Sequence, residues 1–311
     1  MHPFKRILVV LPCILLMAGG SHSGYARAIP PGTPPQLQQI IDSFKGNVAL
    51  AAKNLRTGEV IEINANERVQ TASVIKLPIM VEAFYQAAQE RTPLDRLLML
   101  DKDNRVPGSG ILQDLSDGLI LPLRDAITLM IVLSDNTATN MVIDSLGIDA
   151  VNARMETLGL AQTRLFKKVF LPPPKPSPEQ KRFGLGVTTP SDMLRLLEML
   201  ARGQLVDQAN SETMISILKK QRDRDQIPRF VSYDDLGQNS GGVQVADKTG
   251  ALDNVRNDVG LIITKKGTYL LAIFTWNSPD TRWTPDNAAT LTIARLAKVL
   301  VDHFEQGGNT R

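Results

Sequence analysis

Cysteine and histidine are scarce in this sequence of 311 residues. It has one cysteine, Cys13, and three histidines, two of which (His2 and His22) also lie within the first 28 residues. A chain cleaved after residue 28 keeps only His303 and no thiol. That excludes thiol nucleophiles, disulfides and cysteine-based zinc or iron–sulfur sites. Metal sites with two or more histidines are excluded too, so we expect no metal and no other cofactor.

A surplus of charge is also missing. The formal net charge of +3 comes from the first 28 residues, which hold Lys5, Arg6 and Arg27 and no acid, and 32 basic and 32 acidic residues remain beyond them. A nucleic-acid-binding protein would normally carry a net basic surplus or a basic stripe, so we expect no nucleic-acid partner. The run at residues 219–225 alternates in sign, and we interpret it as a solvated face.

The N-terminus has the pattern of an export signal. Lys5 and Arg6 precede the apolar run Ile7 to Met17, and Ala26-Arg27-Ala28 is typical of a cleavage site. Eleven apolar residues are too few to cross a bilayer comfortably. We therefore predict cleavage near Ala28, export to the periplasm or the cell exterior, and no stable membrane anchor. An uncleaved anchor is the alternative.

Apolar periodicity predicts an α+β protein without internal repeats. Strands near both ends surround a helical middle, which indicates one sheet built from both termini (residues 29–72 and 235–311) and an inserted all-α part (residues 73–234). The predicted helices cover residues 34–44, 74–88, 123–133, 137–146, 150–158, 190–201 and a C-terminal stretch that includes 288–301. The predicted strands cover residues 47–52, 60–63, 244–248, 258–264 and 268–275.

Residues 170–186 interrupt this pattern with a cluster of prolines. So many prolines exclude a regular helix or an inner strand, so we expect a surface loop of unusual length. Long loops in compact domains are often functional, although composition alone leaves a plain linker equally open. The prolines are Pro172, Pro173, Pro174, Pro176 and Pro178.

Because histidine is scarce, proton transfer falls to lysine, tyrosine, serine or carboxylates. Ser73-Val74-Ile75-Lys76 places a hydroxyl and an amine three residues apart, about one turn along the same face of a helix. The free N–H groups at a helix start also point toward developing negative charge. The spacing alone is weak evidence, since Ser216-Ile217-Leu218-Lys219 has it too.

Two further triplets strengthen the interpretation. Ser134-Asp135-Asn136 follows an apolar helix at a break where Asp and Asn are favoured. Lys248-Thr249-Gly250 follows the predicted strand that begins at Gln244. Average residue usage gives all three elements in this order by chance in roughly one of several hundred chains. Together they indicate an active site, although none does so alone.

These three elements resemble the signatures of class A β-lactamases and penicillin-binding proteins. Their separations of 61 and 114 residues are similar to the class A arrangement. The resemblance extends over residues 35–306 and includes Gly108-Ser109-Gly110-Ile111-Leu112 and Thr188-Thr189-Pro190. It implies a β-lactamase-like fold, with an antiparallel sheet and flanking helices from both termini plus an inserted all-α domain. It also implies a monomer whose substrate is a β-lactam or a peptidoglycan peptide.

The resemblance implies acyl transfer. Ser73 would attack an amide carbonyl while Lys76 takes its proton, directly or by relay, and Ser134 would pass a proton to the departing nitrogen. Backbone N–H groups of Ser73 and Ala251 would form the oxyanion hole. The implied substrate-binding residues are Asn136 for the acylamino side chain, Lys248, Thr249 and Arg256 for the substrate carboxylate, and also Gly250 and Ala251.

The long loop departs from the family pattern. Class A β-lactamases use a glutamate there to activate the water that releases the acyl group, and by simple alignment Val169 stands in its place. After Thr163-Arg164-Leu165 no acid occurs before Glu179. The Arg–Asp pair that pins this loop in the family has no obvious counterpart, because Gly186 falls where the acid would be.

Three interpretations remain open. Glu179 folds back over Ser73, and the protein is a working β-lactamase. Alternatively, acylation by β-lactams is a dead end, and the natural substrate is a peptidoglycan peptide or another ester or amide. In the third, the protein is a non-enzymatic β-lactam-binding protein.

Overall fold

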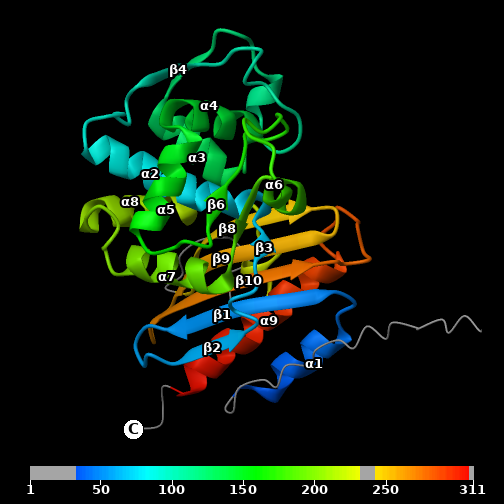
Figure 1. The fold of residues 1–311 in the computed structure, drawn as a ribbon. Coiled ribbons are helices and arrows are strands. Elements are labelled where there is room, and N and C mark those ends of the chain that lie inside the picture. Colours follow the sequence, from blue (N-terminus) through cyan, green and yellow to red (C-terminus); the bar gives the residue numbers. More distant parts are fainter. Residues whose placement is uncertain (1–32, 232–241, 308–311) are drawn as a thin grey trace, which may run out of the picture.

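The computed structural model describes residues 33–231 and 242–307, so the predicted signal peptide and its cleavage site lie outside the described residues. A five-stranded antiparallel sheet has the order β2-β1-β10-β9-β8 (Figure 1). Strands from both ends of the chain meet in it, which confirms the predicted α+β fold. The strands are β1 (Asn47–Asn54), β2 (Val60–Ile63), β8 (Gln244–Leu252), β9 (Val255–Ile263) and β10 (Thr268–Trp276).

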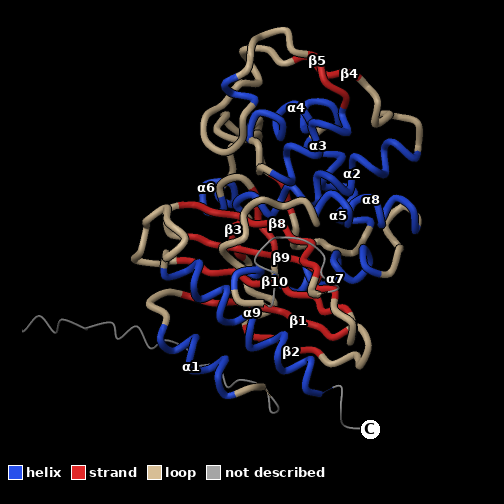
Figure 2. Tube along the Cα trace, turned by 180° about the vertical axis from the view of Figure 1, so that it is seen from behind, coloured by secondary structure: helices blue, strands red, loops and turns tan. Residues whose placement is uncertain are grey.

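Helices cover both faces of this sheet, so its strands bury side chains on both sides. In β1, Leu50 and Ala52 point into a core shared with α1 (Pro35–Ser43) and α9 (Ala288–Gln306), whereas Ala51 belongs to a second core shared with the helical part. Alternation along a strand sends neighbouring side chains to opposite faces. Figure 2 shows α1 and α9 lying over the rear face of the sheet.

The second core is formed largely by the helical part of the chain. Helix α7 packs against β1, β9 and β10, and α2 packs against α3, α4 and α5. Among the described residues, no helix is long and apolar enough to span a membrane. The long helices here are α2 (Lys76–Ala88), α3 (Leu123–Val132), α4 (Asn136–Leu146), α5 (Ile148–Thr157), α7 (Pro190–Ala201) and α8 (Gln208–Leu218).

Several short elements escaped prediction because two to four residues carry too little periodicity. They include the strands that frame the site: β3, paired with β7, which in turn pairs with β6. The short elements are β3 (Val69–Gln70), β4 (Leu97–Met99), β5 (Ile120–Pro122), β6 (Arg164–Leu165), β7 (Gly186–Thr188) and the 3₁₀ turns η1 (Ala72–Ile75), η2 (Leu112–Asp114) and η3 (Ile227–Arg229).

The expectation that prolines exclude any helix from residues 170–186 is wrong. Helix α6 (Pro178–Phe183) forms there, with Pro178 at its first position. Proline is tolerated at that position because the N–H it lacks would have no helical partner. The Ser177 hydroxyl accepts a hydrogen bond from the Gln180 amide at 3.1 Å and caps the helix.

Two smaller expectations also need correction. Lys248-Thr249-Gly250 lies within β8 rather than after it, since that strand continues to Leu252. The run at residues 219–225 is not a fully solvated face. Gln221 is buried, and Arg224 lies 3.8 Å from the fully buried carboxylate of Asp247.

Candidate active site

Ser73 lies on η1, three residues before Lys76, the first residue of α2. Its neighbours Ala72, Val74 and Ile75 are buried, whereas Ser73 itself is half-buried. Ala72 has a φ of +44°, a conformation unfavourable for a residue with a Cβ. The surrounding packing holds this strained turn in place, and it leaves Ser73 as the half-buried member of an otherwise buried segment.

Lys76 is fully buried, and its amine is held by three acceptors. Nζ donates to the Ser134 carbonyl oxygen at 2.7 Å, to the Ser134 hydroxyl at 3.1 Å and to Oδ1 of Asn136 at 2.9 Å. Burial and the nearby charge of Lys248 lower the pKa of Lys76 well below its usual value, against a smaller opposing effect of Asp135. A buried amine with a lowered pKa can act as a proton acceptor near neutral pH.

Ser134 and Asn136 flank Asp135, the N-cap residue directly before α4. Ser134 has a φ of +52°, which turns the chain sharply between α3 and α4. The Asp135 carboxylate caps α4 by accepting from the Ala138 amide at 2.8 Å, and it accepts from the amides of Ile111 and Leu112 at 2.7 and 2.9 Å. Asp135 is therefore a structural centre that fixes the serine and the asparagine on either side of it.

The glycine-rich segment at residues 108–110 wraps around this turn. The backbone N–H of Asn136 donates to the Ser109 carbonyl oxygen at 2.9 Å. A Cβ on Gly110 would lie 2.2 Å from the Asp135 carboxyl, and Gly110 has a φ of +104°. Glycine is required there for both reasons.

Strand β8 brings the third sequence element to the same place. A Cβ on Gly250 would lie 2.8 Å from the Thr71 carbonyl oxygen and 3.1 Å from the backbone nitrogens of both Ser73 and Val74. Only a glycine allows the strand to approach the Ser73 turn this closely. Ala251, which follows Gly250, is partly exposed and pairs with Arg256 across the ladder.

Lys248 is the second fully buried lysine. Its Nζ donates to the Thr249 carbonyl oxygen at 2.7 Å. Burial lowers the pKa of Lys248 to about 8, although the charges of Asp223, Asp247 and Asp258 oppose the shift. The amine therefore remains largely cationic at neutral pH, where it can attract an anion.

Asn257 is a positioning residue that sequence reasoning missed. It is fully buried on β9, opposite Gly250, and its Nδ2 donates to the carbonyl oxygens of Gln70 at 2.8 Å and Thr71 at 3.1 Å. These bonds tie the Ser73 turn to the sheet. Asn257 lies directly before the predicted strand at residues 258–264, so the strand pattern did not mark it.

Arg256 is held by backbone oxygens. Its guanidinium donates to the carbonyl oxygens of Leu252, Val255 (2.8 Å) and Arg282 (3.0 Å), and it lies 4.7 Å from the centre of the Trp283 ring. The side chain is 5% exposed. Binding of a substrate carboxylate by Arg256 stays a prediction. The same holds for carboxylate binding by the hydroxyl of the buried Thr249.

The long loop is attached to α4 at Val169, which is buried. Asn140 of α4 clamps its backbone from both sides: the Val169 amide donates to Oδ1 of Asn140 at 2.8 Å, and Nδ2 of Asn140 donates to the Val169 carbonyl oxygen at 3.2 Å. The loop is thus fixed at the position that simple alignment assigns to the family glutamate, but an aliphatic side chain stands there.

Glu179 lies farther along the loop, in the first turn of α6. Its carboxylate forms an ion pair with the Arg68 guanidinium at 2.6 Å, and 46% of the Glu179 side chain is exposed. The same guanidinium lies 5.1 Å from the centre of the Phe183 ring. The Glu179 carboxylate is therefore paired at the protein surface with Arg68, the residue directly before β3.

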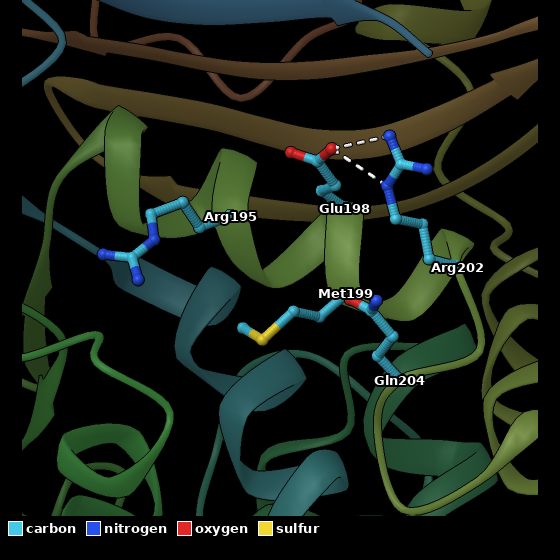
Figure 3. A pocket seen from close by; sticks show the side chains of 5 residues that line it. All are labelled: Arg195, Glu198, Met199, Arg202 and Gln204. Carbon is cyan, nitrogen blue, oxygen red and sulfur yellow. Dashed lines mark hydrogen bonds and ion pairs between the residues drawn. The ribbon is translucent and has the colours of Figure 1, made fainter. Parts of the chain in front are cut away.

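A surface hollow of about 440 Å³ lies elsewhere, on α7 and the turn that follows it (Figure 3). Its lining includes none of the predicted site residues, and its Glu198 side chain is already paired with Lys53 and Arg202. In residues 33–231 and 242–307, no group of three or more His, Cys, Asp or Glu side chains could hold a metal ion. The lining residues are Arg195, Glu198, Met199, Arg202 and Gln204.

Comparison with known proteins gives a family for this arrangement. Residues 34–304 match the beta-lactamase enzyme family. A beta-lactamase from Proteus vulgaris is 25% identical over 260 residues, which cover 81% of this chain and 90% of that protein.

Solved structures agree. The crystal structure of a beta-lactamase from Sphaerobacter thermophilus DSM 20745 superposes with a TM-score of 0.76 at 30% identity, covering 87% of this chain and 97% of that one. PBP-A superposes with a TM-score of 0.73 at 24% identity, covering 90% of this chain and all of PBP-A. A PBP-A mutant was solved as an acyl-enzyme complex with penicillin G, and it shares the fold with a TM-score of 0.74 at 24% identity. Because the family match spans most of the described chain and the fold agrees with it, the protein belongs to the β-lactamase enzyme family of serine hydrolases.

Proposed function

We propose that this protein opens β-lactam rings by forming an acyl-enzyme on Ser73, and that it releases the acyl group slowly. The observation that carries the proposal is the environment of Lys76. Its amine is fully buried and held by Ser134 and Asn136, and its pKa is lowered well below the usual value. An amine in this state can do the work that a histidine does in other serine hydrolases.

The arrangement around Lys76 supports acylation in the following steps. Lys76 takes the proton of the Ser73 hydroxyl as its oxygen attacks the lactam carbonyl carbon, and the C–N bond of the ring then breaks. Ser134, 3.1 Å from the Lys76 amine, relays a proton to the departing nitrogen. The backbone N–H groups of Ser73 and Ala251 stabilise the oxyanion, an effect of about 3 kcal/mol per donor.

Substrate binding uses the charge of Lys248. This lysine, with Thr249 and Gly250 beside it and Arg256 on the neighbouring strand, would orient the substrate carboxylate. The Asn136 side chain would hydrogen-bond the acylamino group of the substrate. Its Nδ2 donates to the Pro107 carbonyl oxygen at 3.1 Å, which fixes the orientation of the amide.

Deacylation is the weaker half of the proposed cycle. Val169 cannot activate a water, and Glu179 is the nearest acid in the loop sequence but pairs with Arg68. These two observations favour a second candidate function, in which β-lactams acylate Ser73 as a dead end and the natural substrate is a peptidoglycan peptide or another ester or amide.

The kinetics of a chromogenic cephalosporin test the proposal. We expect a burst of one equivalent per protein, followed by a slow steady rate, with the acyl adduct visible in the intact mass. Persistent labelling of Ser73→Ala would contradict the role of Ser73.

Further measurements separate the alternatives. If Glu179 activates the water, Glu179→Gln slows the steady rate and leaves the burst unchanged. If the steady rate is zero, release of D-alanine from a pentapeptide distinguishes a peptidase from a non-enzymatic binding protein.

A further inference from the structure

Phe170 is an exposed aromatic side chain on a strained backbone. Phe170 is 64% exposed, so burial of its ring contributes little free energy that could offset the backbone strain. Its φ is +56°, a conformation that is a genuine outlier for a bulky residue. Strain of this kind persists only where the surrounding structure imposes it, and it concentrates at functional sites.

The residues on both sides of Phe170 impose this conformation. Val169 is clamped by the two hydrogen bonds with Asn140, and the Lys167 amine donates to the Leu171 carbonyl oxygen at 3.2 Å, closing the turn around Phe170. The ring is therefore presented by a fixed loop.

The Phe170 ring borders the candidate site at Gly108. A Cβ on Gly108 would lie 3.3 Å from Cε2 of the Phe170 ring and 2.8 Å from Nδ2 of Asn136. The ring and the Asn136 side-chain amide thus both lie next to Gly108. Asn136 is in turn bound to the Lys76 amine at 2.9 Å.

We infer that Phe170 is a specificity-determining residue, whose ring contacts an aromatic or other flat apolar group on the acylamino side chain of the substrate. The inference rests on the proposed function, because it places that side chain at Asn136. The Asn136 side-chain amide offers a polar contact for the amide of the substrate. The exposed Phe170 ring beside it offers an apolar surface for the group attached to that substrate amide. Aromatic pairs of this kind favour stacked or edge-to-face contacts.

The test compares two substrates with the same ring system. Benzylpenicillin carries a phenyl group on its acylamino side chain, whereas 6-aminopenicillanic acid has no acyl side chain. The second-order rate constant of acylation is measured for each by intact mass. We expect Phe170→Ala to lower the constant for benzylpenicillin about fivefold to tenfold and to leave that for 6-aminopenicillanic acid unchanged.

Two variants serve as controls. Phe170→Tyr keeps the ring and is expected to retain the wild-type preference. Phe230→Ala removes another exposed phenylalanine, one on η3's C-terminal side, and is expected to change neither constant. The melting temperature of Phe170→Ala should equal that of the wild type, since the ring is mostly exposed.

The outcomes distinguish this inference from the function on which it rests. A wild-type protein labelled by neither compound would overturn the proposed function. A wild-type protein that is labelled, combined with a Phe170→Ala variant that slows both compounds alike or neither, would overturn the role of Phe170 alone.

Discussion

The two sides of the candidate site are built differently. On the side of Ser73, buried polar groups hold one another: the Lys76 amine has three acceptors, and Asn257 ties the serine turn to the sheet. On the side of the long loop, Val169 is aliphatic, Phe170 is exposed, and the Glu179 carboxylate is paired at the surface.

This difference has a chemical meaning. Burying a polar group without a partner is costly, and the buried Lys76 amine has three acceptors. On the proposed function, this network positions the base that takes the proton of Ser73. The loop is held just as firmly, through Asn140, but it presents no acid at Val169. On the proposed function, this fold would organise acylation while leaving water activation to another residue or to none.

Removal of the nucleophile gives the largest expected effect. Ser73→Ala should abolish covalent labelling by penicillin, because it removes the hydroxyl that the proposed function uses as the nucleophile. The measurement is the intact mass after incubation with excess penicillin. The matched control is Ser216→Ala, which removes the serine of the second Ser-x-x-Lys sequence, on the exposed surface of α8, and should label as the wild type does.

Removal of the base comes next. Lys76→Gln should lower the acylation rate constant by about 10²- to 10⁴-fold, the usual contribution of a positioned proton acceptor. Circular dichroism and a thermal melt verify that the variant is folded, since the side chain is fully buried. A folded Lys76→Gln protein that acylates at the wild-type rate would show that Lys76 is not the base.

The loop side can be altered in the opposite direction. Val169→Glu places a carboxylate on the clamped backbone and should speed deacylation about 100-fold, within the range of general base catalysis. The acylation rate should change little. Val169→Gln has nearly the same shape without the charge and should not speed deacylation. An equal gain in both variants would mean that loop mobility, rather than a base, limits release.

The pH dependence of acylation separates the two buried lysines. Burial and the charge of Lys248 lower the pKa of Lys76, so the neutral amine is present at lower pH than in an ordinary lysine, and the acylation rate should fall as the pH drops through that pKa and the amine gains a proton. The pKa of Lys248 is about 8, so its charge is present below pH 8 and lost above it. We therefore expect a bell-shaped profile for penicillin, with an alkaline fall of about tenfold per pH unit once Lys248 is neutral.

A substrate without a carboxylate should lack the alkaline limb of this profile. A profile that keeps rising to pH 10 with penicillin would contradict the assignment of carboxylate binding to Lys248.

Much of the fold could be predicted from sequence. Long amphipathic stretches such as those at 190–201 and 288–301 carry enough apolar positions to show their period, and helices α7 and α9 form there. Two-residue strands such as β3 and β6 carry none, and their pairing with β7 depends on contacts far apart in the chain. Helix α6 was missed because a proline at a first helical position was taken as a breaker.

The site could be predicted only in part. Spacing brought attention to Ser73, Lys76 and Ser134 because residue identity and helical geometry are local. Asn257 and Asn140 act through backbone groups of distant segments, which no local pattern reveals. The positive φ of Phe170 likewise has no local sequence signal, because it depends on the hydrogen bonds that the neighbouring Val169 makes with the distant Asn140.

The most direct test of the contrast between the two sides is the lifetime of the penicillin adduct. The wild-type protein is mixed with benzylpenicillin, free penicillin is removed rapidly, and the intact mass is followed with time. We predict one equivalent bound at the first time point and a decay that takes minutes or longer. Complete recovery of the unmodified protein within a second, or no adduct at any time in a folded sample, would contradict the account.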